Sequence, residues 1–348
     1  MTEQGDDSAF EMVQARTLAL FPELVRDLGG DPDAMMQAVE IDPATLDGVE
    51  PRVRFRAMIA LLELAAAELA CPDFGMRLAV RQRGAQVFGP LGVVMRNAAT
   101  LGAALRYAAT HMQAYSLAGA MPMERNRESR RVFVGMDFLL DNVPLCAQAV
   151  EQVLLLAHLN AVEITGGRAR VRRVYLRYRP VLPLRVYRQY FGCEVLFDQQ
   201  VNGIVFTEKD MAAPVVDSDA EQHAAAARHI EAAFPDTLAP MHARVRGRLM
   251  RHLGLSDCGI GQIADALCLH PRTLHRRLQA EGKTFEEVKD EVRRDVAHYY
   301  LARTDMPVTR IAEKLGYAET SVLSRSCQRW FGASPRRLRA QVRDGGPA

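Results

Sequence analysis

The sequence predicts a mainly helical protein of two domains, an α+β domain with a small sheet followed by an all-α domain. The chain has 348 residues, which is more than one ordinary hydrophobic core accommodates. Apolar residues recur at helical spacing up to about residue 120 and again from residue 241, whereas short alternating runs fall between these regions. Residues 209–240 are rich in alanine and interrupted by proline, which indicates a linker with a short helix.

The first domain, residues 1–208, begins with helices. Apolar side chains repeat at helical spacing over residues 18–28, and the pair Gly29-Gly30 ends that run. Further helices are expected over residues 55–69, 100–117 and 144–162. Strands are expected over residues 131–138, 171–178 and 203–206.

Composition excludes several classes of protein. No apolar stretch approaches the roughly 18 residues that a membrane span requires, and the acidic, polar start of the chain is unlike a signal or transit peptide. Six cysteines are scattered without a CxxC pair or a histidine at zinc spacing, so we expect reduced, mostly buried thiols, no metal and a cytoplasmic protein. The chain lacks HExxH, GxSxG, a Walker loop and a GxGxxG followed by an acidic residue, so we expect no enzyme and no cofactor.

The charge of the chain is unevenly distributed. From residue 241 onward there are 20 lysines and arginines against 12 aspartates and glutamates, which leaves 24 against 30 in the first 240 residues. A basic module attached to an acidic body is typical of nucleic-acid-binding proteins. Solvated basic faces are also common on other proteins, so charge by itself leaves both interpretations open.

Residues 241–345 contain an internal repeat. One copy, IGQIADALCLHPRTLHRRLQAEG, begins at Ile260, and the other, VTRIAEKLGYAETSVLSRSCQRWFG, begins at Val308. The I-A-x-x-L that starts at Ile263 recurs 48 residues later, and the helix after it recurs at an offset of 49. Each copy supplies a short apolar helix, a break and a second helix, which are the parts of a helix-turn-helix. In the second break, Gly316 suits the left-handed backbone conformation.

The second helix of each copy is predicted to read DNA. These helices are expected over residues 271–281 and 319–331, with Pro271 in a first turn, where its missing N–H is tolerated. Polar residues near each helix start face outward, where they can reach base edges in a major groove. The predicted DNA-binding residues are Arg272, Thr273, His275, Arg276, Thr320, Ser321, Ser324 and Arg325. Two aligned copies in a basic module favour DNA binding over the alternative, an ordinary pair of helical hairpins.

A long helix is predicted between the two copies. Thr284 and Glu287 form a T-x-x-E capping box at its start, and the helical pattern extends to about Arg303. About 20 residues at 1.5 Å each span about 30 Å, which is close to the repeat of B-DNA, about 34 Å. Two second helices held that far apart would enter successive major grooves on one face of the duplex.

The second copy ends in a distinctive sequence, LGYAETSVLSRSCQRWFGASPRRLRA, over residues 315–340. Together with the rest of residues 245–339, it resembles the AraC/XylS family of bacterial transcription regulators, whose signature is I-A-x-x-L-G-F followed by R-x-F-x-R-x-F-G-x-x-P. The matching residues are Ile311, Ala312, Leu315, Gly316, Tyr317, Arg325, Arg329, Phe331, Gly332 and Pro335. The departures from the pattern are Cys327 for the usual Phe, Ala318 for a capping Ser and Leu338 for a late Tyr.

The first domain resembles one branch of that family, in which the N-terminal domain is similar to an arabinose-binding domain. The resemblance lies in CPDFGMRLAVRQRGAQVFGPLGVVMRNAATLGAAL (71–105) and YRQYFGCEVLFDQQVNGIVF (187–206). The motif R-S-C-x-R-W-F-G at 325–332 is similar to that of the mycobacterial virulence-regulator subset. The resemblance implies a one-component regulator, in which the first domain senses an effector or dimerises and the second binds double-stranded promoter DNA. It also implies a homodimer that contacts RNA polymerase and, as in most members, activates transcription.

Polar and aromatic residues around Arg106 and on the following strand suggest an effector site in the first domain. They would line a pocket for a carboxylate with an apolar tail. The candidates are Arg106, Tyr107, His111, Tyr115, Arg131 and Phe133. The alternative is that these are ordinary surface and core residues. A DNA-binding regulator without a small ligand, controlled by a protein partner or by dimerisation alone, is also open at this point.

Overall fold

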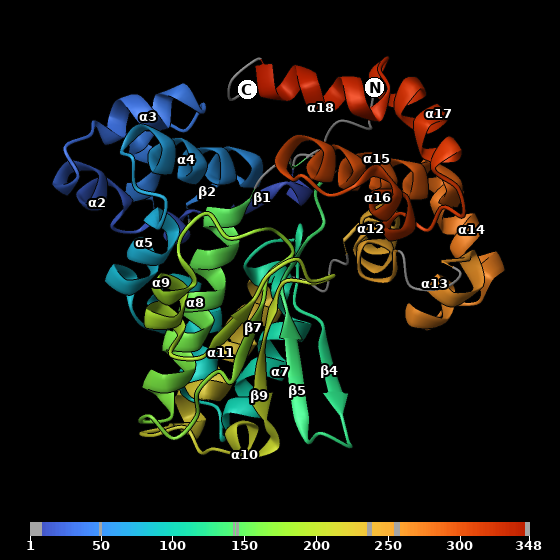
Figure 1. Cartoon of the computed structure of the whole chain (residues 1–348). Coiled ribbons are helices and arrows are strands. Elements are labelled where there is room, and N and C mark those ends of the chain that lie inside the picture. Colours follow the sequence, from blue (N-terminus) through green and yellow to red (C-terminus); the bar gives the residue numbers. More distant parts are fainter. Residues whose placement is uncertain are drawn as a thin grey trace, which may run out of the picture. The chain divides into compact units, whose positions relative to one another are not determined.

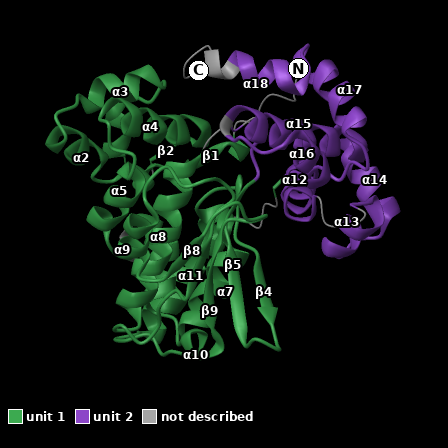
Figure 2. Cartoon of the chain, in the orientation of Figure 1, with its two compact units in different colours: residues 1–138, 146–239 green, residues 139–145, 240–348 purple. Residues whose placement is uncertain are grey.

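The computed structural model describes residues 9–48, 51–141, 143, 146–234, 239–253 and 258–344. The chain forms two compact units (Figure 2). Unit 1 comprises Met1–Phe138 and Cys146–Ala239, and unit 2 comprises Leu139–Leu145 and Pro240–Ala348. Unit 1 combines helices with small sheets and unit 2 is helical, so the expected fold class is confirmed.

The boundary between the units differs from the expected one in two places. Residues 209–240, expected as a linker, include the end of helix α10 (Glu208–Met211) and all of helix α11 (Ala220–Ala233), and both helices belong to unit 1. Helix α11 packs on helix α6 (Gly89–Arg96) and buries Ile230 completely. Its alanine-rich sequence offers little hydrophobic contrast, which is why the packed face was not visible in the pattern. The second difference is that Leu139–Leu145 belongs to unit 2.

Helix α8 (Ala147–Ile164) lies at the centre of unit 1 and is buried on nearly all sides (Figure 1). Because it is buried all round, its polar side chains form hydrogen bonds inside the core. Gln148 Oε1 accepts from the Gly75 amide at 2.7 Å, and Gln152 Nε2 donates to the Thr17 carbonyl at 2.8 Å. The other α-helices of unit 1 are α2 (Phe21–Asp27), α3 (Pro32–Ala38), α4 (Phe55–Glu68), α5 (Phe74–Gln82), α7 (Leu101–Thr110) and α9 (Leu184–Phe191). Its 3-10 helices are η1 (Ala15–Leu18), η2 (Pro43–Asp47), η3 (Ala85–Phe88) and η4 (Met112–Ala114).

The larger sheet of unit 1 has the strand order β4-β5-β9-β7-β8 (Figure 1). Its strands are β4 (Met123–Asn126), β5 (Arg131–Gly135), β7 (Arg173–Tyr175), β8 (Glu194–Leu196) and β9 (Gly203–Thr207). Neighbouring strands are antiparallel except β7 and β8, which are parallel and connected through α9. Two small antiparallel pairs complete the unit, β1 (Met12–Gln14) with β2 (Arg52–Arg54) and β3 (Gly119–Ala120) with β6 (Asp137–Phe138). The run at 131–138, predicted as one strand, is therefore divided between two sheets.

Unit 2 is a bundle of helices around one apolar core (Figure 2). Its helices are α12 (Met241–His252), α13 (Ile260–Ala266), α14 (Pro271–Ala280), α15 (Phe285–Arg303), α16 (Val308–Lys314), α17 (Thr320–Phe331) and α18 (Pro335–Asp344). Val288 and Val292 of α15 are almost fully buried in this core. They are four positions apart, so they lie on one helix face, as the sequence pattern requires.

The described part of the chain lacks two kinds of feature, a membrane-spanning helix and a cluster of metal ligands. None of its helices is both long and apolar enough to cross a lipid bilayer. No three of its histidine, cysteine, aspartate or glutamate side chains gather as metal ligands. The six cysteines are free thiols; Cys71, Cys258 and Cys327 are buried, whereas Cys268 is exposed.

Glu151 is a carboxyl group in the core of unit 1. Its side chain is fully buried, and the Tyr178 hydroxyl donates a hydrogen bond to its Oε1 at 3.0 Å. Burial raises the pKa of Glu151 from 4.5 to about 8. Between these two values the folded chain binds the proton more tightly than the unfolded chain, so stability falls as the pH rises through this window.

Replacing Glu151 with Gln is therefore expected to stabilise unit 1 by about 1–3 kcal/mol at pH 8 and to have little effect at pH 4. Glutamine retains an acceptor for Tyr178 and carries no charge at either pH. Calorimetric unfolding of the full chain at the two pH values measures the difference. An equal effect at both pH values would contradict the explanation from buried ionisation.

Candidate DNA-binding surface

The two repeats of the sequence form two helix-turn-helix units, α13 with α14 and α16 with α17 (Figure 1). Equivalent residues of the two copies occupy equivalent places in the core. The buried residues are Ile263, Ala264, Leu274 and Leu278 in the first copy and Ile311, Ala312, Leu323 and Cys327 in the second. Burial raises the pKa of the Cys327 thiol to about 11, so this residue is a neutral core group where the family pattern has a ring.

Each turn contains one residue in the left-handed region. Gly316 has φ = 71°, which confirms the prediction for the second copy. Cys268 lies 48 positions earlier, at the equivalent place, and has φ = 55°. A residue with a Cβ is strained in this conformation. The first turn therefore has the same conformation as the second, but with cysteine in place of the glycine that this conformation favours.

The second helices start with different caps. Helix α14 starts at Pro271, as predicted, and the Nδ1 atom of His270 accepts a hydrogen bond from the Arg272 amide at 3.2 Å. Helix α17 starts after Glu319, which forms no side-chain cap. The Glu319 carboxylate instead accepts from the Ser321 hydroxyl at 2.8 Å.

The eight predicted DNA-binding residues lie in two groups, one on each second helix. Thr273 and Thr320 are half-buried and the other six are exposed. A surface hollow of about 360 Å³ lies along α14 and is lined by His270, Arg272, Thr273, His275, Arg276 and Gln279. A hollow of about 390 Å³ at the start of α17 includes Thr320 and Ser321. The Ser324 hydroxyl donates to the Thr320 carbonyl at 3.1 Å, so in the DNA-free structure this hydroxyl forms a hydrogen bond within α17.

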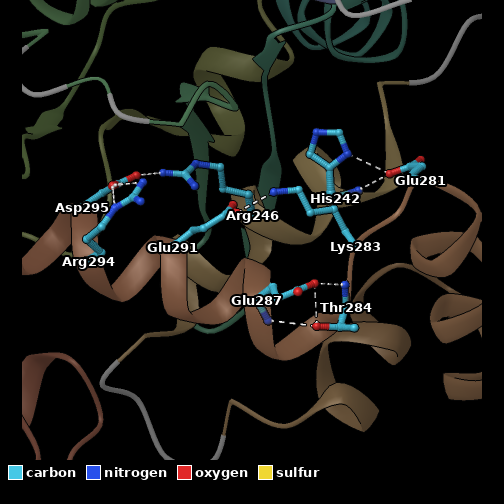
Figure 3. Close-up of polar contacts among 9 residues, drawn as sticks. All are labelled: His242, Arg246, Glu281, Lys283, Thr284, Glu287, Glu291, Arg294 and Asp295. Carbon is cyan, nitrogen blue, oxygen red and sulfur yellow. Dashed lines mark hydrogen bonds and ion pairs between the residues drawn. The ribbon is translucent and has the colours of Figure 1, made fainter. Parts of the chain in front are cut away.

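Helix α15 connects the two helix-turn-helix units and is fixed at its start. The predicted capping box is present: the Glu287 amide donates to Thr284 Oγ1 at 3.2 Å, and the Thr284 amide donates to Glu287 Oε2 at 2.7 Å (Figure 3). Lys283, just before the helix, forms an ion pair with Glu291 at 2.6 Å. The 19 residues of α15 correspond to a length of about 28 Å at 1.5 Å per residue.

Polar side chains of α15 hold the second helix-turn-helix unit. Asp290 accepts from Arg329 Nη2 at 2.5 Å and from the indole Nε1 of Trp330 at 2.8 Å. Arg293 donates to the carbonyl of Leu315 at 3.0 Å, and its guanidinium lies 4.5 Å from the centre of the Tyr317 ring. These contacts connect the middle of α15 to both the turn and the second helix of the unit.

Glu281, at the end of α14, caps α12 across the first unit (Figure 3). Its carboxylate accepts from the amides of Met241 at 2.6 Å and His242 at 2.9 Å, and from His242 Nδ1 at 2.8 Å. These partners are about 40 positions apart in the sequence, so no local pattern indicated the cap.

A cluster of arginines beside the first unit was not predicted from the sequence. The pKa of Arg244 is lowered by burial first and then by the neighbouring charges of Arg277 and Arg248. Arg244 and Arg248 are four positions apart on α12, and this R-x-x-x-R spacing was the available signal. The cluster places positive charge between α12 and the last turn of α14.

Two known families match the chain. Residues 29–215, more than half of the chain, match the arabinose-binding domain of AraC transcription regulators. Residues 263–341 match a helix-turn-helix domain. The chain belongs to the AraC family of transcription regulators. This AraC-family protein is a DNA-binding transcription regulator, as its resemblance predicted.

Two related regulators agree with this assignment over nearly the whole chain. The HTH-type transcriptional regulator VirS of Mycobacterium tuberculosis is 33% identical over 94% of this chain and 96% of its own length. The ornithine utilization regulator of Pseudomonas aeruginosa is 26% identical over 93% of this chain and 95% of its own. The crystal structure of the transcriptional regulator CdpR from Pseudomonas aeruginosa has a TM-score of 0.42 at 23% identity, covering 89% of this chain and 96% of that one.

The six predicted effector-binding residues lie in three places in unit 1. Arg106 is exposed on α7, and the ring of Tyr107 stacks on that of His111 with centroids 3.9 Å apart. Arg131 and Phe133 lie on β5, where Phe133 faces Tyr175 at 6.0 Å between ring centroids. Tyr115 lines a small cavity of about 10 Å³, to which none of the other five contributes. The walls of this cavity are Thr17, Phe55, Met58, Tyr115, Gly119, Met136, Phe138, Ala149, Gln152, Val153 and Leu156.

Replacing Cys268 with Gly is expected to stabilise unit 2 by about 0.5–1 kcal/mol. Glycine relieves the left-handed strain, and the greater freedom of the unfolded chain offsets part of that gain. The matched reverse change, Gly316→Ala, is expected to destabilise the unit by about 1 kcal/mol or more. Urea unfolding followed by the fluorescence of Trp330, the only tryptophan of the chain, measures both effects. A destabilised Cys268→Gly variant would contradict the equivalence of the two turns.

Replacing Asp290 with Ala is expected to lower affinity for specific DNA about fivefold, equivalent to about 1 kcal/mol. The change releases Trp330 and Arg329, so α17 loses its fixed position against α15. Titration of labelled DNA by fluorescence anisotropy measures the loss. Glu286→Ala is the control, because it removes an exposed negative charge from the same helix. If the two variants bind alike, Asp290 has no positioning role.

Proposed function

We propose that this AraC-family regulator reads two successive major grooves with α14 and α17 and activates transcription from the promoters it binds. One observation carries the proposal: two equivalent second helices, each with four polar residues near its start, are attached to one connecting helix. Arg272, His275 and Arg276 would contact bases in the first groove. Thr320, Ser321, Ser324 and Arg325 would contact the next. Arginine can donate two hydrogen bonds to a guanine edge, and the hydroxyl residues suit base or phosphate contacts.

The arginine cluster of α12 supplies phosphate contacts in this proposal. Burial first, and then repulsion from the positive charges of Arg277 and Arg248, lowers the pKa of Arg244 in the free protein. A DNA phosphate beside them would relieve that repulsion. Phosphate contacts fix the position of the protein on the duplex without carrying sequence information, and they make affinity fall steeply with salt.

Unit 1 would control DNA binding through a small-molecule effector or through dimerisation. The match to an arabinose-binding domain of AraC regulators supports an effector-binding role. The carboxylate with an apolar tail stays a prediction, because its six residues lie in three separate places. A homodimer that contacts RNA polymerase is what the family resemblance implies for an activator.

Binding of the full chain to genomic fragments, including the region upstream of its own gene, tests the proposal. The measurement is made at about 50 mM and about 200 mM salt. Selective retention of a few fragments, weakened at the higher salt, is the expected result. Equal retention of all fragments at both salt concentrations would contradict sequence-specific regulation.

Arg276→Ala and Arg325→Ala are each expected to weaken binding to a selected operator by about 1–3 kcal/mol and to relax specificity at one base pair. Each change removes a base contact in one groove, so binding to unrelated DNA should change less. Arg310→Ala is the control, because Arg310 is an exposed arginine of unit 2 that forms an ion pair with Glu313 at 2.6 Å. Operator binding that survives both arginine changes would show that these helices do not read the bases.

A further inference from the structure

The chain enters unit 2 twice, first for the short segment Leu139–Leu145 and again at Pro240. Phe138 is the last residue of the first part of unit 1, Leu139–Leu145 belongs to unit 2, and Cys146 resumes unit 1 (Figure 2). We name residues 139–141 the strap. Leu139 and Leu140 are buried, with 5% and 3% of their surface exposed.

Arg246 of α12 anchors the backbone of the strap. Its Nε donates to the carbonyl of Leu140 at 3.0 Å, and its Nη2 binds Asp295 of α15 (Figure 3). The Arg246 side chain is 4% exposed and that of Asp295 is 15% exposed. A buried arginine between a carbonyl and a carboxylate is costly to separate from either partner. The Arg246 side chain therefore connects the strap to both α12 and α15.

Gly247 provides a second, independent anchor. A Cβ atom on Gly247 would lie 2.6 Å from Cδ2 of Leu139, so the absence of a side chain leaves the space that Leu139 fills. This contact is apolar and involves a different strap residue from the Arg246 bond. Two neighbouring positions of α12 thus hold two neighbouring positions of the strap.

The strap directly follows a wall of the small cavity in unit 1. Phe138, which precedes the strap, lines the cavity, and so does Met136. Helix α8, which begins at Ala147, also contributes Ala149 and Gln152 to the lining. The chain therefore leaves one wall of the cavity for unit 2 and returns to another.

We infer that the strap transmits the state of this cavity to α12 and α15 of the DNA-binding unit. The inference rests on the proposed control of DNA binding by unit 1. At about 10 Å³ the cavity has room for about one water molecule. A larger occupant must move a wall. Strand β6, with Phe138, has two residues and pairs with the equally short β3, whereas the other walls include the long helices α4 and α8.

The lining also defines the class of occupant. Gln152 Nε2 already donates to the Thr17 carbonyl at 2.8 Å and to Gln82 Oε1 at 2.9 Å. The Thr17 hydroxyl donates to the carbonyl of Gln14 at 2.6 Å. The remaining lining is mostly aromatic, Met and aliphatic side chains. A small, uncharged and mainly apolar molecule fits this lining, since a charge would be buried without a partner.

Hydrogen exchange in the full chain without DNA tests the inference. Leu156→Phe adds bulk at a cavity wall that lies far along α8 from the strap. Leu155→Phe is the matched control, because Leu155 is fully buried on the same helix and does not line the cavity. Arg246→Met and Leu139→Ala each release one anchor of the strap. Asp295→Asn is the control that weakens the ion pair and leaves the Leu140 bond in place.

Leu156→Phe is expected to raise amide exchange in α12 roughly threefold or more, whereas Leu155→Phe leaves it unchanged. Because the Arg246→Met and Leu139→Ala backgrounds each keep the other anchor, Leu156→Phe should raise exchange in α12 less in either background than in the otherwise unchanged chain. An α12 that does not respond to Leu156→Phe, or that responds equally in the released backgrounds, would overturn the inference. Because no DNA is present, this result is independent of whether the chain selects an operator.

A second pair of measurements covers the case in which Leu156→Phe does not fold. Leu156→Ala enlarges the cavity, and benzene is the probe because apolar cavities of this kind bind it. Benzene is expected to change α12 exchange in Leu156→Ala and to change it less in Leu156→Ala combined with Arg246→Met. Binding of benzene, detected by a raised unfolding temperature of unit 1, without any response in α12 would overturn the inference.

Discussion

Helix α15 follows the first helix-turn-helix unit in the chain and packs on α12 and on both helices of the second unit, so its position constrains how the two units are joined. Its apolar face, with Val288 and Val292, forms part of the common core. Its start is fixed by the Thr284–Glu287 capping box. A continuous helix is stiff over its length, so the separation of α14 and α17 follows from the number of residues in α15 rather than from a flexible connection. The two sets of base-reading residues therefore act as one rigid reader in the proposed function.

Polar residues at different positions along α15 contact different parts of the DNA-binding unit. Asp290 and Arg293 hold α17 and the second turn, and Asp295 binds Arg246, which holds the strap. The helix that sets the spacing of the two readers is thus also the helix that the strap reaches. This arrangement gives a physical route by which unit 1 would act on DNA binding without touching the residues that contact DNA. A change in the bond between Arg246 and the strap alters the support of α15, and both readers depend on that support.

Much of unit 2 was predictable because local rules determine it. The I-A-x-x-L repeat, Pro271, Gly316 and the capping box each have an effect within a few residues of their own position, and each is present as predicted. The features that escaped prediction depend on residues far apart in the sequence. Glu281 caps α12 across about 40 positions, and Arg246 binds Leu140 across 106. Hydrophobic periodicity along the sequence does not indicate pairs of residues that are this far apart.

Unit 1 was less predictable for related reasons. Its strands have two to five residues, too few to show a clear alternation, and β5 and β6 are separated by a single residue although they belong to different sheets. Helix α11 was assigned to a linker because alanines give no strong apolar face, yet Ile230 fixes it to the unit. The effector candidates were chosen by spacing along one helix and one strand, and tertiary packing separated them. The left-handed conformation of Cys268 was not predicted either, because the packing of α13 against α14 determines the turn in which this residue lies.

Hydroxyl-radical footprinting of the full chain on a selected operator tests the central claim most directly. If α14 and α17 enter successive major grooves, two protected patches are expected on one face of the duplex, about 10 base pairs apart from centre to centre. Arg325→Ala is also expected to weaken protection in one patch and to leave the other in place. A single patch, or two patches on opposite faces of the duplex, would contradict the claim that α15 holds two helices for successive major grooves.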